Sequence, residues 1–217
     1  MTRSTGRPKA ITDLIQKACT AFDKNDYFKA ETALEKAVGM LRARHDWAGM
    51  AEVLGQLRDT RRARRKLALA SRASVCIIDA DVPEEGATTK GRYLIQPPLV
   101  GADARRFRLA SKDNAVAAVV VCREPTTRLG EIPVVAIAPG ATIRVRIEPP
   151  GDESKPSASW FRSAMEALAK EALAMDQPTL EMSKRVDRLL ALLDAVPDED
   201  GPHDRLIEVC ENFSEDD

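Results

Sequence analysis

The stretch AVAAVVVC, Ala115–Cys122, is an uninterrupted apolar run near the middle of the chain. It is rich in valine, a β-branched residue that favours strands. Apolar and polar residues do not alternate in it, which indicates that both faces of the strand are covered. It is also far shorter than the roughly 20 residues that cross a bilayer. We therefore expect a central strand of a parallel sheet.

Shorter apolar runs on both sides of this strand fit one small sheet. They are VCIID (75–79), RYLIQ (92–96), EIPVVAIA (131–138) and TIRVRIE (142–148). The last two are joined by Pro139-Gly140-Ala141, which predicts a hairpin. In TIRVRIE, apolar residues alternate with Arg144 and Arg146, which is typical of an edge strand with one solvated face.

A helical pattern at 102–112 separates the strands expected at 92–96 and 115–122. A helix between neighbouring strands predicts a right-handed crossover. The sequence thus predicts a small mixed α/β domain over residues 74–150.

Residues 11–73 contain two passes of a helical pattern, shifted by 33 residues. The first pass has a polar turn at DKND, 23–26. The paired positions are Leu14 and Trp47, Ala18 and Ala51, Ala21 and Leu54, Ala30 and Ala63, Leu34 and Leu67, and Ala37 and Ala70.

The second pass reads Trp47-x2-Met50-Ala51-x2-Leu54 and then Ala63-x3-Leu67, which resembles the tetratricopeptide family. The resemblance covers about the first third of the chain. It implies helix–turn–helix units of 34 residues that bind other proteins. The aromatic expected at Ala21 and Leu54 and the terminal proline are missing. Since two units cannot bury a continuous core, we expect the C-terminal helices or a second copy of the chain to cover them.

The remaining segments complete a three-part organisation. Residues 1–10 are expected to be a disordered tail, and residues 151–217 an acidic helical region that ends in SEDD. Helices are predicted there at 159–175, 180–196 and 205–213. The predicted fold class is therefore α/β with flanking helical regions: tetratricopeptide-like hairpins, a small mixed sheet and C-terminal helices.

Charge is distributed unevenly along the chain. Residues 1–72 hold 16 Lys and Arg against 8 Asp and Glu, whereas residues 151–217 hold 7 against 17. On a helix, four arginines share one face, turned away from Ala63, Leu67 and Ala70: Arg58, Arg61, Arg62 and Arg65. This face is open to three interpretations: a solvated surface, a docking surface for acidic protein that includes the chain's own C-terminal region, or a nucleic-acid contact.

Two loops follow the carboxyl ends of the expected parallel strands, where ligand sites form in α/β sheets. They carry Asp103, Arg123, Glu124, Thr126, Thr127 and Arg128. Arginine and hydroxyl groups could hold a phosphate or carboxylate here. In the alternative interpretation, Asp103 is a favourable charge at a helix start, and Arg123 and Glu124 form a local ion pair.

The sequence shows no catalytic or metal-binding motif. Cys19, Cys76, Cys122 and Cys210 lie too far apart for a zinc knuckle or a redox pair. Their apolar surroundings predict buried free thiols in a reducing compartment. The N-terminus has no apolar segment typical of a signal peptide. We therefore expect a cytoplasmic protein without metal or other cofactor.

These patterns favour a non-catalytic protein–protein interaction module, an adaptor or an assembly factor. The expected partner is another protein, or the basic N-terminal and acidic C-terminal regions associate with each other. One alternative is an enzyme or small-molecule-binding protein that uses the strand-end loops. Another is an RNA-binding protein that uses the basic helix.

Overall fold

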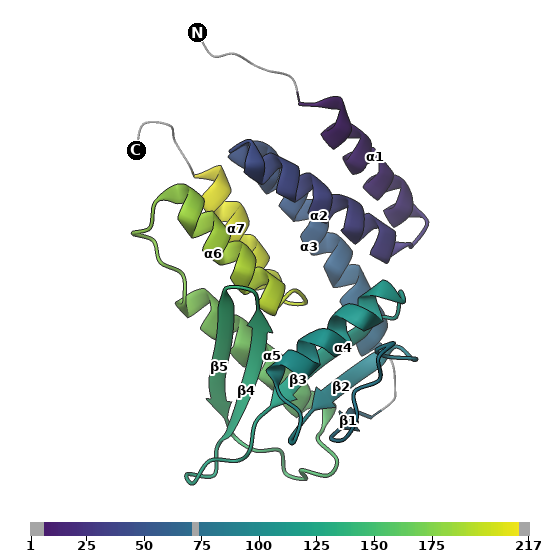
Figure 1. Cartoon of the computed structure of the whole chain (residues 1–217), viewed down its shortest axis with the longest axis vertical. Coiled ribbons are helices and arrows are strands. Elements are labelled where there is room, and N and C mark those ends of the chain that lie inside the picture. Colours follow the sequence, from purple (N-terminus) through teal and green to yellow (C-terminus); the bar gives the residue numbers. More distant parts are fainter. Residues whose placement is uncertain (1–6, 71–73, 213–217) are drawn as a thin grey trace.

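The computed structural model describes residues 7–70 and 74–212. Within them lie seven helices and one five-stranded mixed sheet (Figure 1). In chain order the elements are α1 (Lys9–Asp23), α2 (Tyr27–Ala43), α3 (Trp47–Leu69), β1 (Cys76–Ile78), β2 (Gly91–Ile95), α4 (Gly101–Asp113), β3 (Ala118–Arg123), β4 (Ile132–Ala138), β5 (Ala141–Ile147), α5 (Ala158–Ala174), α6 (Met182–Ala195) and α7 (Asp200–Glu211). This order confirms the predicted α/β fold with flanking helical regions at both ends.

The sheet has the strand order β1-β2-β3-β4-β5. Strands β1, β2 and β3 are parallel, and α4 connects β2 to β3, so the predicted crossover between adjacent strands is confirmed. β4 runs antiparallel to both β3 and β5, and the predicted hairpin forms with Pro139 and Gly140 at its turn. The apolar run 115–122 enters the sheet only at Ala118, because Ala115 adopts a left-handed conformation after α4 (φ 56°).

Both faces of the sheet are covered. On one face, Leu94, Val119 and Val121 belong to the larger core, which includes Phe161 of α5 and residues of α3 and α7. On the other face, Tyr93 and the buried Cys122 pack with residues of α4. β5 is an edge strand whose buried and exposed residues alternate, as its sequence predicts.

The N-terminal helices differ from the expected pair of hairpins. α1 and α2 form a hairpin, but residues 47–69 are one continuous helix of 23 residues. The first turn depends on Asn25 in a left-handed conformation (φ 59°) and on Asp26, which accepts the N–H of Lys29. A shift of 33 residues places Arg58 and Asp59 at these positions, and the helix continues through them.

The same turn instead recurs after 20 residues. His45 is also left-handed (φ 56°), and the side chain of Asp46 accepts the N–H of Gly49 at 2.9 Å. Left-handed conformations are enriched in Asn and His, and Asp is a preferred N-cap. KNDY and RHDW are therefore the repeated signal in this region.

The buried face of α3 also differs from the prediction. Leu67 is 40% exposed and Ala70 is exposed, although the 33-residue alignment places both at packing positions. From Arg61 to the end of α3, the buried residues are instead Arg61, Arg64 and Ala68. The C-terminal part of α3 can bury cations because acidic residues of neighbouring elements pack against it.

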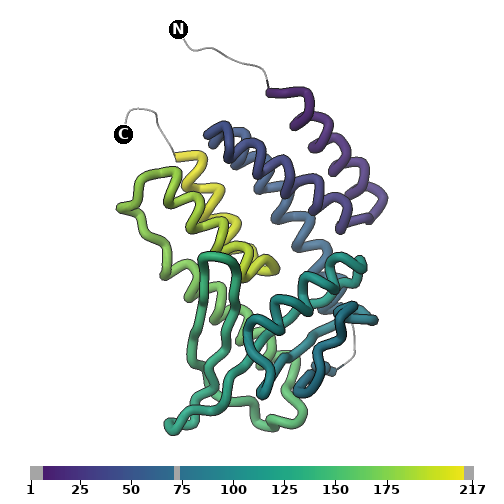
Figure 2. The backbone as a smooth tube through the Cα atoms, in the orientation of Figure 1, coloured from purple at the N-terminus to yellow at the C-terminus, as the bar shows by residue number. Residues whose placement is uncertain are grey.

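The C-terminal helices cover α3. α7 packs along it, and the backbone trace shows the two helices side by side (Figure 2). α7 begins at Asp200, five residues before the predicted start, with Pro202 in its first turn, where proline is tolerated. The predicted tail at residues 1–10 contains the start of α1, while residues 1–6, Phe213 and SEDD lie outside the described residues.

Candidate functional site

A cluster of charged side chains joins α3 to α2, α4 and the segment that leads into α7. We call it the charged junction. It consists of Glu31, Glu35, Arg61, Arg64, Arg65, Lys112, Asp198, Glu199, Asp200 and His203.

Glu31 lies at the centre of the charged junction and is 1% exposed. Its carboxylate accepts a hydrogen bond from Arg61 Nε at 2.9 Å and lies 3.2 Å from Arg64 Nη1. Lys112 Nζ is 3.5 Å away. Burial by itself raises the pKa of Glu31, but the charges of Arg64, Arg61 and Lys112 outweigh it and lower this pKa to about 2. Glu31 is therefore an anion that helps to neutralise three cations.

His203 contacts Arg61, a partner of this carboxylate, and is also 1% exposed. Its Nε2 is 3.3 Å from Arg61 Nη1, and its Nδ1 is 2.9 Å from the carbonyl oxygen of Glu199. Arginine can only donate, so Nε2 accepts from Arg61 and Nδ1 donates to the carbonyl. Burial and the charge of Arg61 lower the pKa of His203 to about 3, and the ring is neutral.

The predicted basic face of α3 meets acidic residues of the same chain. Arg58 donates to Asp204 at 2.6 Å, and Arg62 donates to Asp200 at 3.1 Å. Arg65 donates to the carbonyl of Asp198 and pairs with Glu199 and Asp200. Arg61 instead pairs with Glu31 and Glu35 of α2. The structure thus brings all four arginines into ion pairs within one chain.

The strand-end loop residues make separate contacts with different parts of the chain. Asp103 accepts the N–H of Val100 at 2.9 Å, which confirms its place at a helix start. Arg123 donates to Gln96 at 2.9 Å and pairs with Glu153, whereas Glu124 pairs with Arg144. The expected Arg123–Glu124 ion pair is therefore replaced by two separate contacts. Thr126 and Arg128 are exposed, and the main-chain N–H of Thr127 donates to Glu131.

The four cysteines fall into two classes. Cys122 and Cys210 are buried, and burial raises the pKa of each thiol to about 12. Cys19 and Cys76 are exposed, so the expectation that all four are buried is wrong for these two. The thiol of Cys19 in α1 lies 3.8 Å from Oε1 of Gln56 in α3, and Cys76 begins the edge strand β1.

The thiols should therefore react with a thiol reagent in two separate phases. Cys19 and Cys76 should be modified rapidly in the folded protein, and Cys122 and Cys210 only on unfolding, because a buried thiol yields little thiolate. Mass spectrometry of the modified peptides after a short exposure measures this. Rapid modification of Cys122 in the folded state would contradict the described packing of β3 against α4.

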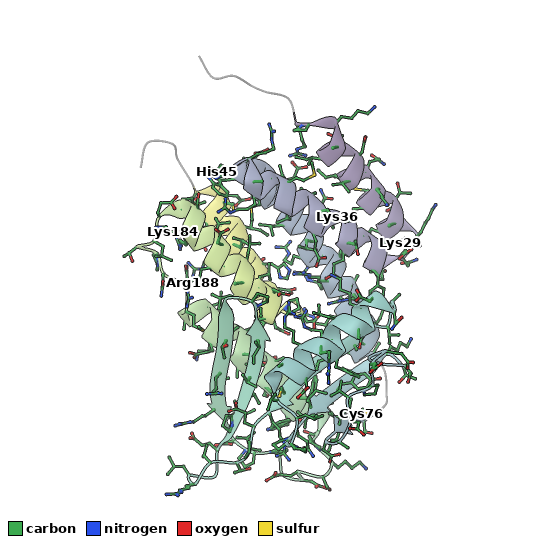
Figure 3. The ribbon with its side chains drawn as sticks, in the orientation of Figure 1. Lys29, Lys36, His45, Cys76, Lys184 and Arg188 are labelled. Atoms are coloured by element: carbon green, nitrogen blue, oxygen red, sulfur yellow. The ribbon has the colours of Figure 1, made fainter. Side chains whose placement is uncertain are left out.

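A second basic surface is formed by helices that are distant in sequence. Figure 3 shows Lys36 on α2 and Lys184 and Arg188 on α6, on the same side of the molecule. We call this surface the α2–α6 face and define it by Lys36, Met40, Arg44, Lys184 and Arg188. Beside this face, Asp187 is held in an ion pair, in which its carboxylate lies 2.6 Å from Arg42. No local charge run marks this face in the sequence, so it could not be predicted from the sequence.

Comparison with known protein families, with curated proteins and with solved structures finds no match to this chain. Within residues 7–70 and 74–212, no helix has the length and apolar composition of a membrane span. The same residues contain no group of three or more His, Cys, Asp or Glu side chains arranged to hold a metal ion. The function of this chain is therefore inferred from its own geometry, without a relative as a guide.

Proposed function

We propose that this protein is a non-catalytic interaction module, an adaptor or an assembly factor, that binds an acidic segment of another protein through the α2–α6 face. One observation carries the proposal. In the part of the chain that the structure describes, Lys36, Arg44, Lys184 and Arg188 have no carboxylate at ion-pair distance. The arginines of α3, by contrast, are engaged with the chain's own acidic residues.

The α2–α6 face also offers apolar contact area. Lys36, Met40 and Arg44 follow one another at spacings of four residues and therefore form one ridge of α2. Met40 is 37% exposed, and the Cα of Gly39 has open space beside it. Methionine adapts its shape to different partners, and interfaces commonly combine an apolar centre with a polar rim. An acidic segment with one or two apolar side chains complements this arrangement.

Two other functions have less support. Nucleic-acid binding through α3 would require Arg58, Arg62 and Arg65 to leave their carboxylate partners. Catalysis or ligand binding at the strand-end loops would require Arg123 and Glu124 to leave separate contacts. Binding through the α2–α6 face requires no such rearrangement.

Reversing two charges on this face should abolish partner binding. The test compares capture from a nuclease-treated native extract by the wild type and by the double variant Lys36→Glu, Lys184→Glu, with the bound proteins identified by mass spectrometry. We expect proteins with acidic segments to bind the wild type and the yield to fall at least about tenfold in the variant, because like charges now face each other. A higher salt concentration should also weaken the wild-type complex, because salt screens the charges.

The matched control is the double variant Lys155→Glu, Lys170→Glu, which makes the same change in net charge on exposed residues outside the α2–α6 face. This control should capture the same proteins as the wild type. Equal losses in both variants would show a non-specific charge effect and contradict the proposal. Proteins that the wild type captures from an untreated extract, but not from a nuclease-treated one, would favour nucleic-acid binding instead.

A further inference from the structure

β4 separates from β3 within the sheet. The two strands pair only at Cys122–Val135 and Arg123–Val134, whereas β4 pairs with β5 along its whole length. The N–H of Glu124 donates to Pro133. In an antiparallel pair, every second residue directs its main-chain groups to the same neighbouring strand. Val120 lies four residues before Glu124, so its N–H and C=O groups also point toward β4. Its counterpart by register, Ile137, pairs with Thr142 of β5 and not with Val120.

The resulting wedge encloses a partly open cavity of about 50 Å³. Its walls come from β3, β4, the first half of α4, α5 and the connection between α6 and α7. One water needs about 10–15 Å³ on this measure, so the cavity has room for about three to five water-sized groups. Aliphatic side chains, among them Val121, Met165 and Leu168, make up much of the wall.

One polar side chain on this wall has a donor without an acceptor. Arg105 donates from Nη2 to Asp194 at 2.9 Å, but its Nε is buried and has no hydrogen-bond partner. A buried N–H without an acceptor loses its hydration without compensation. The two carboxylates on the same wall are already engaged, Asp198 by Arg64 and Glu199 by Arg65. Asp194, the partner of Arg105, is also held by Arg108.

The charges on the wall determine the class of ligand. The wall holds two guanidinium groups, those of Arg105 and Arg108, and two carboxylates, those of Asp198 and Glu199, so its charges balance and it does not favour an additional anion. An amide or similar neutral group can accept from Arg105 Nε and complement the main chain of Val120, while its alkyl part contacts Val121 and Leu168. We propose that the wedge between β3 and β4 binds a small neutral molecule with a carboxamide-like group, of about four or five non-hydrogen atoms.

The test is a titration of the full-length, nitrogen-15-labelled protein with propionamide, followed by nuclear magnetic resonance. The Nε–H signal of Arg105 and the amide signal of Val120 should shift and saturate with a Kd on the order of millimolar, which suits a ligand of this size. Propionate, which has the same shape and a negative charge, should bind at least about tenfold more weakly. Arg105→Lys, which keeps the charge and removes Nε, should lose most of the affinity for propionamide.

A variant that fills the cavity separates specific binding from a solvent effect. Ala104→Leu places a larger side chain on the wall and should abolish saturation; Ala136→Val is the smaller substitution if the first lowers the melting temperature sharply. Shifts that stay linear with propionamide, or saturate equally in the filled variant, would show that the cavity holds water only and would overturn the proposal. Tighter binding of propionate would overturn the assignment to a neutral ligand.

Discussion

Replacing Glu31 with glutamine is expected to lower the free energy of unfolding by about 3–5 kcal/mol, the usual cost of removing one partner from a buried ion pair. Glutamine keeps the size of the side chain, so the loss reports on charge and not on packing. Arg61 and Arg64 are 7% and 4% exposed and would keep a buried positive charge with less compensation. Urea unfolding near neutral pH measures the change.

Asp204→Asn is the matched control for this prediction. Asp204 of α7 pairs with Arg58 of α3, the helix that also carries Arg61 and Arg64. The Asp204 side chain is 54% exposed, so the loss should not exceed about 1 kcal/mol. If the two variants lose the same stability, the charged junction is not buried as described.

The effect of Glu31→Gln should also depend on pH, with a definite sign. The pKa of Glu31 is lowered to about 2 in the folded protein, against about 4.3 in an unfolded chain. A lowered pKa contributes stability that is complete above the unfolded value and disappears as the pH falls toward the folded value. The difference between wild type and variant should therefore be largest near pH 6 and shrink between about pH 4 and pH 2. A difference that grows on acidification would contradict the ion pairs of Glu31.

Replacing Gly86 with alanine is expected to cost at least about 3 kcal/mol, since unfavourable backbone strain and overpacking add. Gly86 has a φ of 75°, and a Cβ at this position would lie 2.3 Å from the main-chain nitrogen of Ser111 in α4. The neighbouring Ala87 donates its N–H to Ser111 Oγ at 2.8 Å, so the loop cannot move away without losing this bond. Thermal or urea unfolding of the variant measures the loss.

Gly130→Ala separates the two contributions. Gly130 has nearly the same φ, 80°, but no atom lies within 4 Å of its Cβ position. It should therefore show the backbone strain alone, about 1–2 kcal/mol. An equal loss in both variants would mean that the 84–87 loop does not pack against α4.

Local patterns were sufficient to predict the sheet. The uniform apolar run that supplies β3, the alternation in β5 and the Pro139-Gly140 turn each report on a strand's own surroundings. The separation of β4 from β3 could not be predicted in this way, because it depends on α4. A Cβ on Gly101 would lie 2.6 Å from Ile137, so this helix start and β4 are in close contact.

A repeat period of 33 residues places the wrong residues of α3 on its buried face. Small residues at a spacing of 33 suggested a second hairpin, but alanine fits both tight contacts and half-exposed positions, and Ala63 is only partly buried. The turn residues Asn25 and His45 carry more information, because few residue types tolerate their left-handed backbone.

The candidate site was predicted only in part. The arginines of α3 and the acidic C-terminal region were recognised as charge clusters, but Glu31 was not, because a single acidic residue in a helical pattern is ordinarily solvated. The α2–α6 face could not be predicted from the sequence, since Lys36 and Lys184 lie on helices that the whole sheet separates in the chain.

The long separation between α3 and its acidic partners has a consequence for synthesis on the ribosome. Arg65 and Asp198 are 133 residues apart, and Arg58 and Asp204 are 146 residues apart. At about 5–20 residues per second, translation takes on the order of 7–30 s to reach these partners after α3 has been made. Throughout this interval the nascent chain carries an arginine-rich helix whose acidic partners in the C-terminal region have not yet been synthesised, although Glu31 and Glu35 of α2 are already present. Docking of α7 on α3 is therefore a late event in the folding of the emerging polypeptide.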